Sequence, residues 1–237
     1  MVRGMSFTGF PKGGVNFFRQ LAVLQDREWF KAHKADYEAL WQQPMTELFD
    51  ELHARLQRTF PGVKRSRPKV FRIYRDVRFS KDKAPFKTEC AAVLALYPSA
   101  AGLESATGFY CSFGETPYVA AGRWRLDGPQ LQRFRMVVAD DKTGAPVAAF
   151  LKKLEQRGFK VAAHEALKRP PPGVDQAHPR VELLKLKGCA VEFPPRTVAQ
   201  LADGKKLVDG LVKDVEQAAP LLRWAEALAR GKPLPKL

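Results

Sequence analysis

The chain has 237 residues, of which 45% are hydrophobic, and this is enough for one large domain with a substantial core. Its 40 Lys and Arg against 25 Asp and Glu give a formal charge of +15, which attracts phosphates, nucleic acids or anionic lipid head groups. The N-terminus lacks the apolar stretch of a secretory signal, and no apolar run approaches the roughly 20 residues of a membrane-spanning helix. We therefore expect a cytoplasmic protein without a transmembrane segment.

The first predicted elements are helices. Apolar residues recur at helical spacing from Val15 to Leu56, and Asp26 stands where an N-cap is expected. Pro44 suits the first turn of a new helix, which places a break near Gln42 and Gln43. From Val70 onward the apolar period changes to two, which predicts antiparallel strands. The predicted strands are Val70–Phe79, Glu89–Tyr97, Gly108–Phe113 and Pro117–Leu126.

Helices return in the second half of the chain. Asp127, followed by Gly and Pro, predicts the start of a helix, and short strands are expected near residues 159–163 and 191–193. Further helices are expected over residues 146–156, 178–185 and 198–230, the last interrupted near Gly204 and Pro220. The order predicts an α+β fold with N-terminal helices, an antiparallel or mixed β meander and an amphipathic C-terminal helical segment. We expect a single domain over residues 1–237.

The most unusual stretch is a basic segment, which we define as Lys64–Lys87. It holds ten Lys and Arg against two Asp, a local net charge of +8, just over half of the total. If it is a strand, Phe71, Ile73, Arg75, Val77 and Phe79 share its core face, and Arg72, Tyr74, Asp76, Arg78 and Ser80 share the other. An arginine on an apolar face must be paired, so we expect Arg75 to meet a carboxylate or to reach the edge of a pocket.

The basic segment also predicts an anion-binding site. Arg72 and Arg78 flank Tyr74, and guanidinium groups bind phosphate or carboxylate oxygens through two parallel hydrogen bonds. The alternative without a ligand is a solvated strand whose arginines pair with Asp76, Asp82 or acidic residues of the N-terminal helices. The predicted ligand-binding residues are Arg72, Tyr74, Arg75, Arg78, Ser80, Lys81, Lys83, Lys87, Trp124 and Arg180.

Four stretches of the chain resemble one protein family. They are ArgGluTrpPhe at residues 27–30, the stretch 71–88, the strand at 118–124 and the proline-rich stretch 167–185. Together they resemble the domain-of-unknown-function family 2461 over nearly the whole chain, a resemblance that implies no established activity. The family tends to show asparagines where this chain has Leu24, Gln25 and Asp26, and a glycine run where it has Ala120, Ala121 and Gly122. Alanines at 120 and 121 argue against close backbone approach to a ligand there.

Candidates for catalysis and metal binding are few. His178 is the candidate acid or base near neutral pH. Asp175, His178 and Glu182 are spaced so that they could share a helix face as metal ligands, and the alternative is that Asp175 caps a helix whose first turn holds His178. The cysteines, Cys90, Cys111 and Cys189, form no CxxC pair and are expected to be buried or idle thiols. The sequence assigns no cofactor and no oligomeric state.

Three functions compete. A small-molecule binder or enzyme would hold a phosphorylated or carboxylated ligand in an enclosed cluster, with His178 as candidate acid or base. A nucleic-acid binding module would present an open basic stripe, with Tyr74 or Trp124 stacking on bases. A structural or interaction domain would bind no ligand. Between Arg65 and Arg78, Arg outnumbers Lys five to one, which suits fixed bidentate contacts, so the sequence favours a small anionic ligand.

Overall fold

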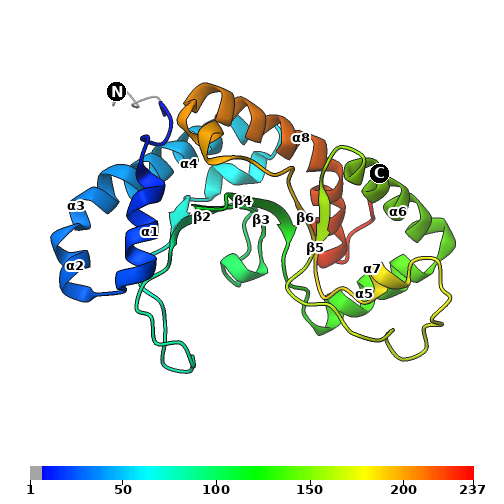
Figure 1. Cartoon of the computed structure of the whole chain (residues 1–237). Helices are drawn as coiled ribbons and strands as arrows, with labels where there is room; N and C mark the ends of the chain where they lie inside the picture. The colour runs from blue at the N-terminus through cyan, green and yellow to red at the C-terminus, as the bar shows by residue number, and fades with distance from the viewer. Residues whose placement is uncertain (1–6) are drawn as a thin grey trace. The chain divides into compact units, whose positions relative to one another are not determined.

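The computed structural model describes residues 7–237, apart from the side chain of Glu104. The prediction that the N-terminus is not a secretory signal rests partly on residues 1–6, which lie outside this range. Figure 1 shows the chain coloured from its N-terminus to its C-terminus. The mixed α+β class predicted from the order of elements is confirmed. Within residues 7–237 no helix combines the length and the apolar character needed to cross a bilayer.

The N-terminal helices form as the apolar spacing predicts. Asp26 caps α2 by accepting a hydrogen bond from the backbone N–H of Trp29 at 2.7 Å. The predicted break near Gln42 is wrong, because a π-helical turn runs directly into α4, whose first turn contains Pro44. A proline lacks the N–H that an inner helical turn needs, and a wider turn beside it changes the register without ending the helix. The elements are α1 (Gly14–Leu24), α2 (Arg27–Ala32), α3 (Lys34–Tyr37), the π turn η1 (Glu38–Gln42) and α4 (Gln43–Leu56).

A six-stranded antiparallel sheet follows, with the order β1-β2-β3-β4-β6-β5. The first four strands are neighbours in chain order, so the predicted meander is confirmed. β6 then pairs with both β4 and β5, placing Gly122 opposite Ala190 and Val161 opposite Val191. The strands are β1 (Lys69–Val70), β2 (Glu89–Tyr97), β3 (Thr107–Gly114), β4 (Tyr118–Arg123), β5 (Lys160–Ala162) and β6 (Cys189–Glu192).

The predicted strand Val70–Phe79 is wrong over most of its length. After β1 the chain leaves the sheet as a long loop, visible in Figure 1 before β2, with one isolated bridge between Tyr74 and Phe86. The loop carries its own hydrogen bonds: Asp76 accepts from the N–H of Arg78, and Asp82 accepts from the N–H of Ala84. Such local bonds from aspartate to the backbone compete with a strand ladder, which explains why the alternating sequence does not extend β1.

The second half contains the remaining helices. Asp127 caps α5 through a reciprocal capping box with Gln130, as predicted. α6 begins before the predicted position because Asp140 caps it, and Pro146 lies inside the helix. The predicted interruption near Pro220 is wrong, since α8 continues through that residue. The helices are α5 (Gly128–Ala139), α6 (Asp141–Glu155), α7 (Val181–Leu184) and α8 (Gly204–Ala229), with 3-10 turns η2 (Pro61–Arg65), η3 (Leu103–Ser105) and η4 (Val198–Ala202).

The chain divides into two compact units, and boundaries between them fall inside β2, β3, β4 and α8. The first contains the chain up to Leu94 together with Tyr110–Tyr118 and Pro195–Val212, and the second contains Ala95–Phe109, Val119–Pro194 and Lys213–Leu237. The first unit's core includes Leu21, Trp41, Met45, Leu48, Phe49 and Leu52. The second unit's core includes Phe109, Phe134, Leu154, Val191, Phe193 and Trp224. The organisation as a single domain stays a prediction.

Candidate functional site

The basic segment lies in the first unit and presents most of its cations to solvent. It starts in η2, passes through β1 and ends in the loop before β2. Burial still alternates along the loop as the strand prediction requires, with Ile73 buried between the exposed side chains of Arg72 and Tyr74. Phe79, predicted for the core face, is instead 96% exposed. The alternation therefore ends before the tip of the loop.

Two arginines of the segment are held by its own aspartates. Arg75 donates from Nη1 to Asp82 Oδ2 at 2.6 Å and to the carbonyl of Ala84 at 3.1 Å, so the prediction that Arg75 is paired is confirmed. Arg78 donates from Nε and Nη2 to the two carboxylate oxygens of Asp76, at 3.0 and 2.7 Å. This fork is the main reason that the pKa of Asp76 lies below its ordinary value. The pKa of Asp82 is lowered chiefly by the N–H of Ala84 and then by Arg75.

The other predicted binding residues of the segment have varied surroundings. Lys83 donates from Nζ to the carbonyl of Val77 at 3.0 Å, and Lys87 lies 5.5 Å from the centre of the Phe71 ring. Ser80 is half-buried at the loop tip and donates its N–H to the same carbonyl of Val77. The cations of the basic segment that are exposed and make no ion pair among residues 7–237 are Lys64, Arg65, Arg67, Lys69, Arg72, Lys81 and Lys83.

Aromatic side chains attach the loop to the N-terminal helices. Tyr74, which is 48% exposed, meets the edge of Phe30 in α2 at 5.8 Å and also packs against Phe86. The N–H of Phe86 donates to Oε1 of Gln25 at 3.0 Å. Gln25 has φ of 43°, the left-handed region that asparagine enters more easily than glutamine.

Trp124 and Arg180 belong to the second unit. The Trp124 ring is exposed and tilts against His164 at a centroid distance of 6.5 Å. Arg180 is only 8% exposed, and its guanidinium closes the C-terminus of α5. Nε donates to Val138 O at 2.6 Å, and Nη2 donates to Ala139 O at 2.9 Å and to Asp141 Oδ1 at 2.6 Å. Arg180 therefore stabilises the corner between α5 and α6.

His178 is engaged through both ring nitrogens. The N–H of Arg180 donates to Nδ1 at 3.0 Å, so Nδ1 carries no proton and Nε2 donates to Ala139 O at 3.3 Å. Asp175 accepts from the N–H of Ala177, and Glu182 pairs with Lys185 at 2.7 Å. The predicted helix is shorter than expected and begins after Arg180, so Asp175 closes a turn and does not cap it. Across residues 7–237 no group of three His, Cys, Asp or Glu is arranged to hold a metal ion.

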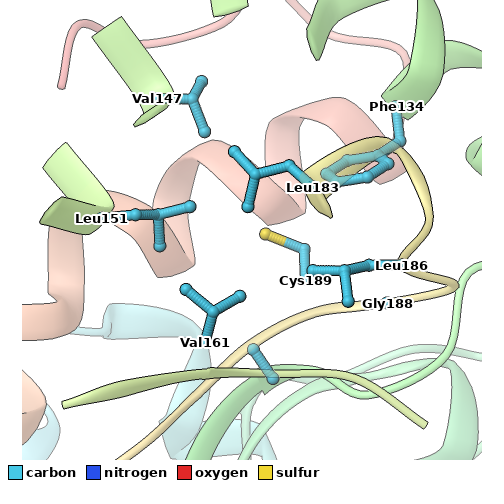
Figure 2. A pocket seen from close by; sticks show the side chains of 9 residues that line it. Phe134, Val147, Leu151, Val161, Leu183, Leu186, Gly188 and Cys189 are labelled. Carbon is cyan, nitrogen blue, oxygen red and sulfur yellow. The ribbon is translucent and has the colours of Figure 1, made fainter. Parts of the chain in front are cut away.

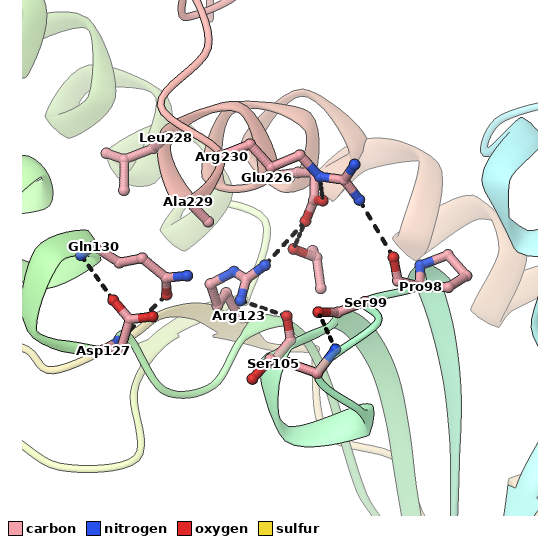
Figure 3. A network of polar contacts seen from close by, with 12 residues as sticks. Pro98, Ser99, Ser105, Arg123, Asp127, Gln130, Glu226, Leu228, Ala229 and Arg230 are labelled. Atoms are coloured by element: carbon pink, nitrogen blue, oxygen red, sulfur yellow. Dashed lines mark hydrogen bonds and ion pairs between the residues drawn. The ribbon is translucent and has the colours of Figure 1, made fainter.

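Sequence reasoning missed a polar pocket in the second unit, with a volume of about 360 Å³. Figure 3 shows its polar groups, which come from the β2–β3 connection, the end of β4, the start of α5 and the end of α8. Those that carry its chemistry are Ser99, Ser105, Arg123, Asp127, Glu226 and Arg230. A second, apolar cavity of about 10 Å³ lies beside Cys189, between Leu151 and Val161 (Figure 2). It is too small for a ligand.

One carboxylate joins the polar groups of this pocket. Glu226, 6% exposed, accepts from Thr107 Oγ1 at 2.6 Å and from Arg123 Nη2 at 3.3 Å through Oε2, while Arg230 Nε binds its other oxygen. Arg123, 4% exposed, also donates from Nη1 to Ser105 O at 2.5 Å. Its Nε is buried and has no partner among the described residues. The sequence signal that could have indicated this site was Glu226 itself, a single glutamate within the apolar stripe at the end of α8.

The comparisons with known proteins agree with the resemblance read from the sequence. The sequence model of a family described as "Conserved hypothetical protein (DUF2461)" matches residues 14–224. This range includes the basic segment and Arg123, and it ends before Glu226. None of the curated proteins matches the chain. Because the match covers most of its length, the chain belongs to the DUF2461 family of conserved hypothetical proteins.

Proposed function

We propose that the protein binds single-stranded nucleic acid through the basic segment. The observation that supports this most directly is Phe79, a large apolar ring that is 96% exposed in a loop surrounded in sequence by cations. A ring in water gains stabilisation when a base stacks on it, and stacking accepts any base because every base has a flat π face. Tyr74, at 48% exposure, offers a second such surface in the same loop.

The charge arrangement supports binding of the phosphate backbone. The exposed cations without an ion pair among the described residues, such as Arg65, Arg67 and Arg72, can each neutralise a phosphate and release its counterion. The guanidinium of Arg78 lies 5.8 Å from the centre of the Phe79 ring, so charge and aromatic surface coincide at the tip. This combination of a basic groove or stripe with stacking rings is common to proteins that bind single strands without sequence preference.

The same geometry counts against a small anionic ligand at this segment, the function that the arginine content favours. A small anion needs several donors converging on one point, yet Arg75 and Arg78 already bind Asp82 and Asp76. A ligand would have to displace those carboxylates from close hydrogen bonds. A polymer has no such requirement, because it makes separate contacts with cations that lie apart and are exposed.

The test is fluorescence anisotropy with a labelled oligonucleotide of about 15 nucleotides, titrated at salt concentrations from about 50 to about 200 mM. Phe79→Ala should weaken binding by roughly 5- to 150-fold with an unchanged salt dependence, since stacking is worth about 1–3 kcal/mol per base. The double substitution Arg72→Ala/Lys81→Ala should lower the slope of log K against log salt by about 1.4, at roughly 0.7 per charge.

A matched control removes the same charge elsewhere. Lys152 and Lys153 are exposed on α6, so Lys152→Ala/Lys153→Ala lowers the net charge as much as Arg72→Ala/Lys81→Ala does. If this control weakens binding equally, attraction is diffuse and the basic segment is not the site. If the wild-type protein binds no oligonucleotide even at low salt, the proposal is wrong and the cations serve structure or solubility.

A further inference from the structure

The pocket around Arg123 has the size of a binding site for a small molecule. Its volume of about 360 Å³ lies at the lower end of the range for ligand pockets, roughly 300–1,000 Å³. At about 30 Å³ per water molecule it would hold roughly a dozen waters, so it is too large to be explained by one bridging water or one ion. Ser99, Ala100, Ala101 and Ser105 form one wall, and such short side chains leave room for a guest.

The pocket contains two arginines, of which Arg123 is buried and Arg230 is about half exposed. Arg123 and Arg230 both bind Glu226, so two guanidinium groups share one carboxylate. Glu226 also accepts from Thr107, so three donors share its two oxygens. Asp127 lines the pocket as well, but it is exposed, and its Oδ1 accepts from the N–H of Gln130 at the positive end of α5. Glu226 pairs with both guanidinium groups at once, so an anion in the pocket would offer them further acceptor oxygens.

A comparison of two buried arginines in the same unit shows that Arg123 is incompletely held. Arg180 is satisfied at Nε and Nη2 by three contacts of 2.6–2.9 Å. Arg123 donates from Nη1 to Ser105 O at 2.5 Å, but its bond to Glu226 is long, at 3.3 Å, and its Nε has no partner among the described residues. Nε and Nη2 form one edge of the guanidinium, and this edge is the one that binds carboxylate or phosphate oxygens in pairs. Figure 3 shows this side chain between the serine wall and the start of α5.

We propose that this pocket binds a small, hydroxylated molecule through an anionic group, a carboxylate or a phosphate ester, held by Arg123 and Arg230. The anionic group supplies further acceptor oxygens for the two guanidinium groups that share Glu226. The hydroxyl groups of the ligand bond to Ser99, Asp127 and Gln130, which line the same pocket. This site lies in the second unit, belongs to different residues from the basic segment and stands whether or not the protein binds nucleic acid.

The experiment is thermal unfolding of the whole chain with glycerol phosphate, ribose phosphate, malate, citrate and inorganic phosphate, followed by calorimetric titration of any compound that raises Tm. Binding to the native state raises Tm by mass action. The phosphate esters and the carboxylates form separate arms, which identifies the anionic group. Because salt only weakly screens charge interactions inside a partly enclosed pocket, the rise in Tm should persist at moderate salt.

Two variants locate the site. Arg230→Ala keeps the buried pair of Arg123 and Glu226 and should weaken the titrated affinity by at least tenfold. Arg157→Ala removes an exposed arginine of the same unit that does not line the pocket, and its affinity should equal that of the wild-type protein. Equal weakening by both variants would show general charge attraction and overturn the proposal, as would the absence of a Tm shift with every compound.

A second measurement does not depend on a folded Arg123 variant. In the wild-type protein labelled with nitrogen-15 at arginine, the Nε–H signal of Arg123 should move on titration with the compound that raises Tm. Arg230→Ala should move that signal less at the same ligand concentration. A signal that stays fixed at saturation would show that the ligand binds elsewhere, which would overturn the assignment of this pocket.

Discussion

Gly122 in β4 lies so close to its partner Ala190 in β6 that a Cβ at Gly122 would fall 2.3 Å from the Cα of Ala190. The φ of Gly122 is also 144°, a backbone conformation that side chains with a Cβ rarely adopt. Gly122→Ala should therefore lower the free energy of unfolding by about 3 kcal/mol or more, since neither strand can move without breaking the ladder. Urea unfolding followed by circular dichroism measures this change.

Gly128→Ala is the matched control. Gly128 begins α5, and a Cβ there would meet nothing within 4 Å. Alanine is the better helix former by about 1 kcal/mol in a helix interior, so this variant should be as stable as the wild-type protein or slightly more stable. Comparable losses of unfolding free energy in Gly122→Ala and Gly128→Ala would show that the close packing of β4 on β6 does not cause the destabilisation.

The sequence predicts the helices and the sheet meander because their signals are local. Leu48, Phe49, Leu52 and Leu56 recur at the helical period and are all buried in α4. The loop after β1 has the alternating apolar and polar residues of a strand. The strand ends because Asp76 and Asp82 accept hydrogen bonds from the loop backbone, and the hydrophobic period of a sequence carries no information about such bonds. At the end of β4, Ala120 and Ala121 fit as buried residues, whereas Gly122 needs to lack a Cβ.

Local patterns in the sequence could not predict the pocket. Arg123 and Glu226 are 103 residues apart, and no periodicity relates a strand end to a helix end at that separation. The basic segment is evident from the sequence because its charges are contiguous. Yet contiguous charges here are mostly exposed or paired with neighbours, while Arg123, one of two arginines whose buried Nε lacks a partner among the described residues, stands alone in an apolar strand.

Gln25 tests how the loop is attached to the helices. Gln25→Gly and Gln25→Ala both remove the hydrogen bond to the N–H of Phe86, but only alanine keeps a Cβ at φ of 43°. The glycine variant should therefore be more stable than the alanine variant by about 1 kcal/mol. Urea unfolding of the two variants gives the difference. Greater stability of the alanine variant would show that the left-handed conformation at this position is not strained.

Asp76 and Asp82 should respond differently when Arg78 is replaced. The pKa of Asp76 is lowered from 3.8 mainly by Arg78, so Arg78→Gln should raise it toward that value. The pKa of Asp82 is lowered first by the N–H of Ala84, so it should stay low in the same variant. NMR titration of the two carboxyl groups measures both, and equal shifts would contradict the separate pairing seen here.

The sign of the pH effect follows from those lowered pKa values. A carboxylate whose pKa is lower in the folded state stabilises that state above its unfolded pKa, and this contribution is lost as pH falls through the folded value. The contribution of Asp76 to the order of the loop should thus be complete above about pH 3.8 and be lost as pH falls further, through the lowered pKa at which the folded Asp76 becomes protonated. Amide hydrogen exchange at the N–H of Arg78 across this range would detect the loss. Protection that is unchanged well below pH 3 would contradict the role of Asp76.

The three cysteines should be unreactive in the native protein. All are free and buried, and burial raises the pKa of Cys90 and of Cys189 to about 12 and that of Cys111 as well. Only the thiolate attacks Ellman's reagent, and at pH 8 a thiol with such a pKa is ionised in roughly one molecule in ten thousand. We expect negligible colour from the native protein and reaction of all three thiols in denaturant. Rapid reaction of one thiol under native conditions would show that its strand opens to solvent, since neither the pKa nor the burial seen here permits attack from the folded state.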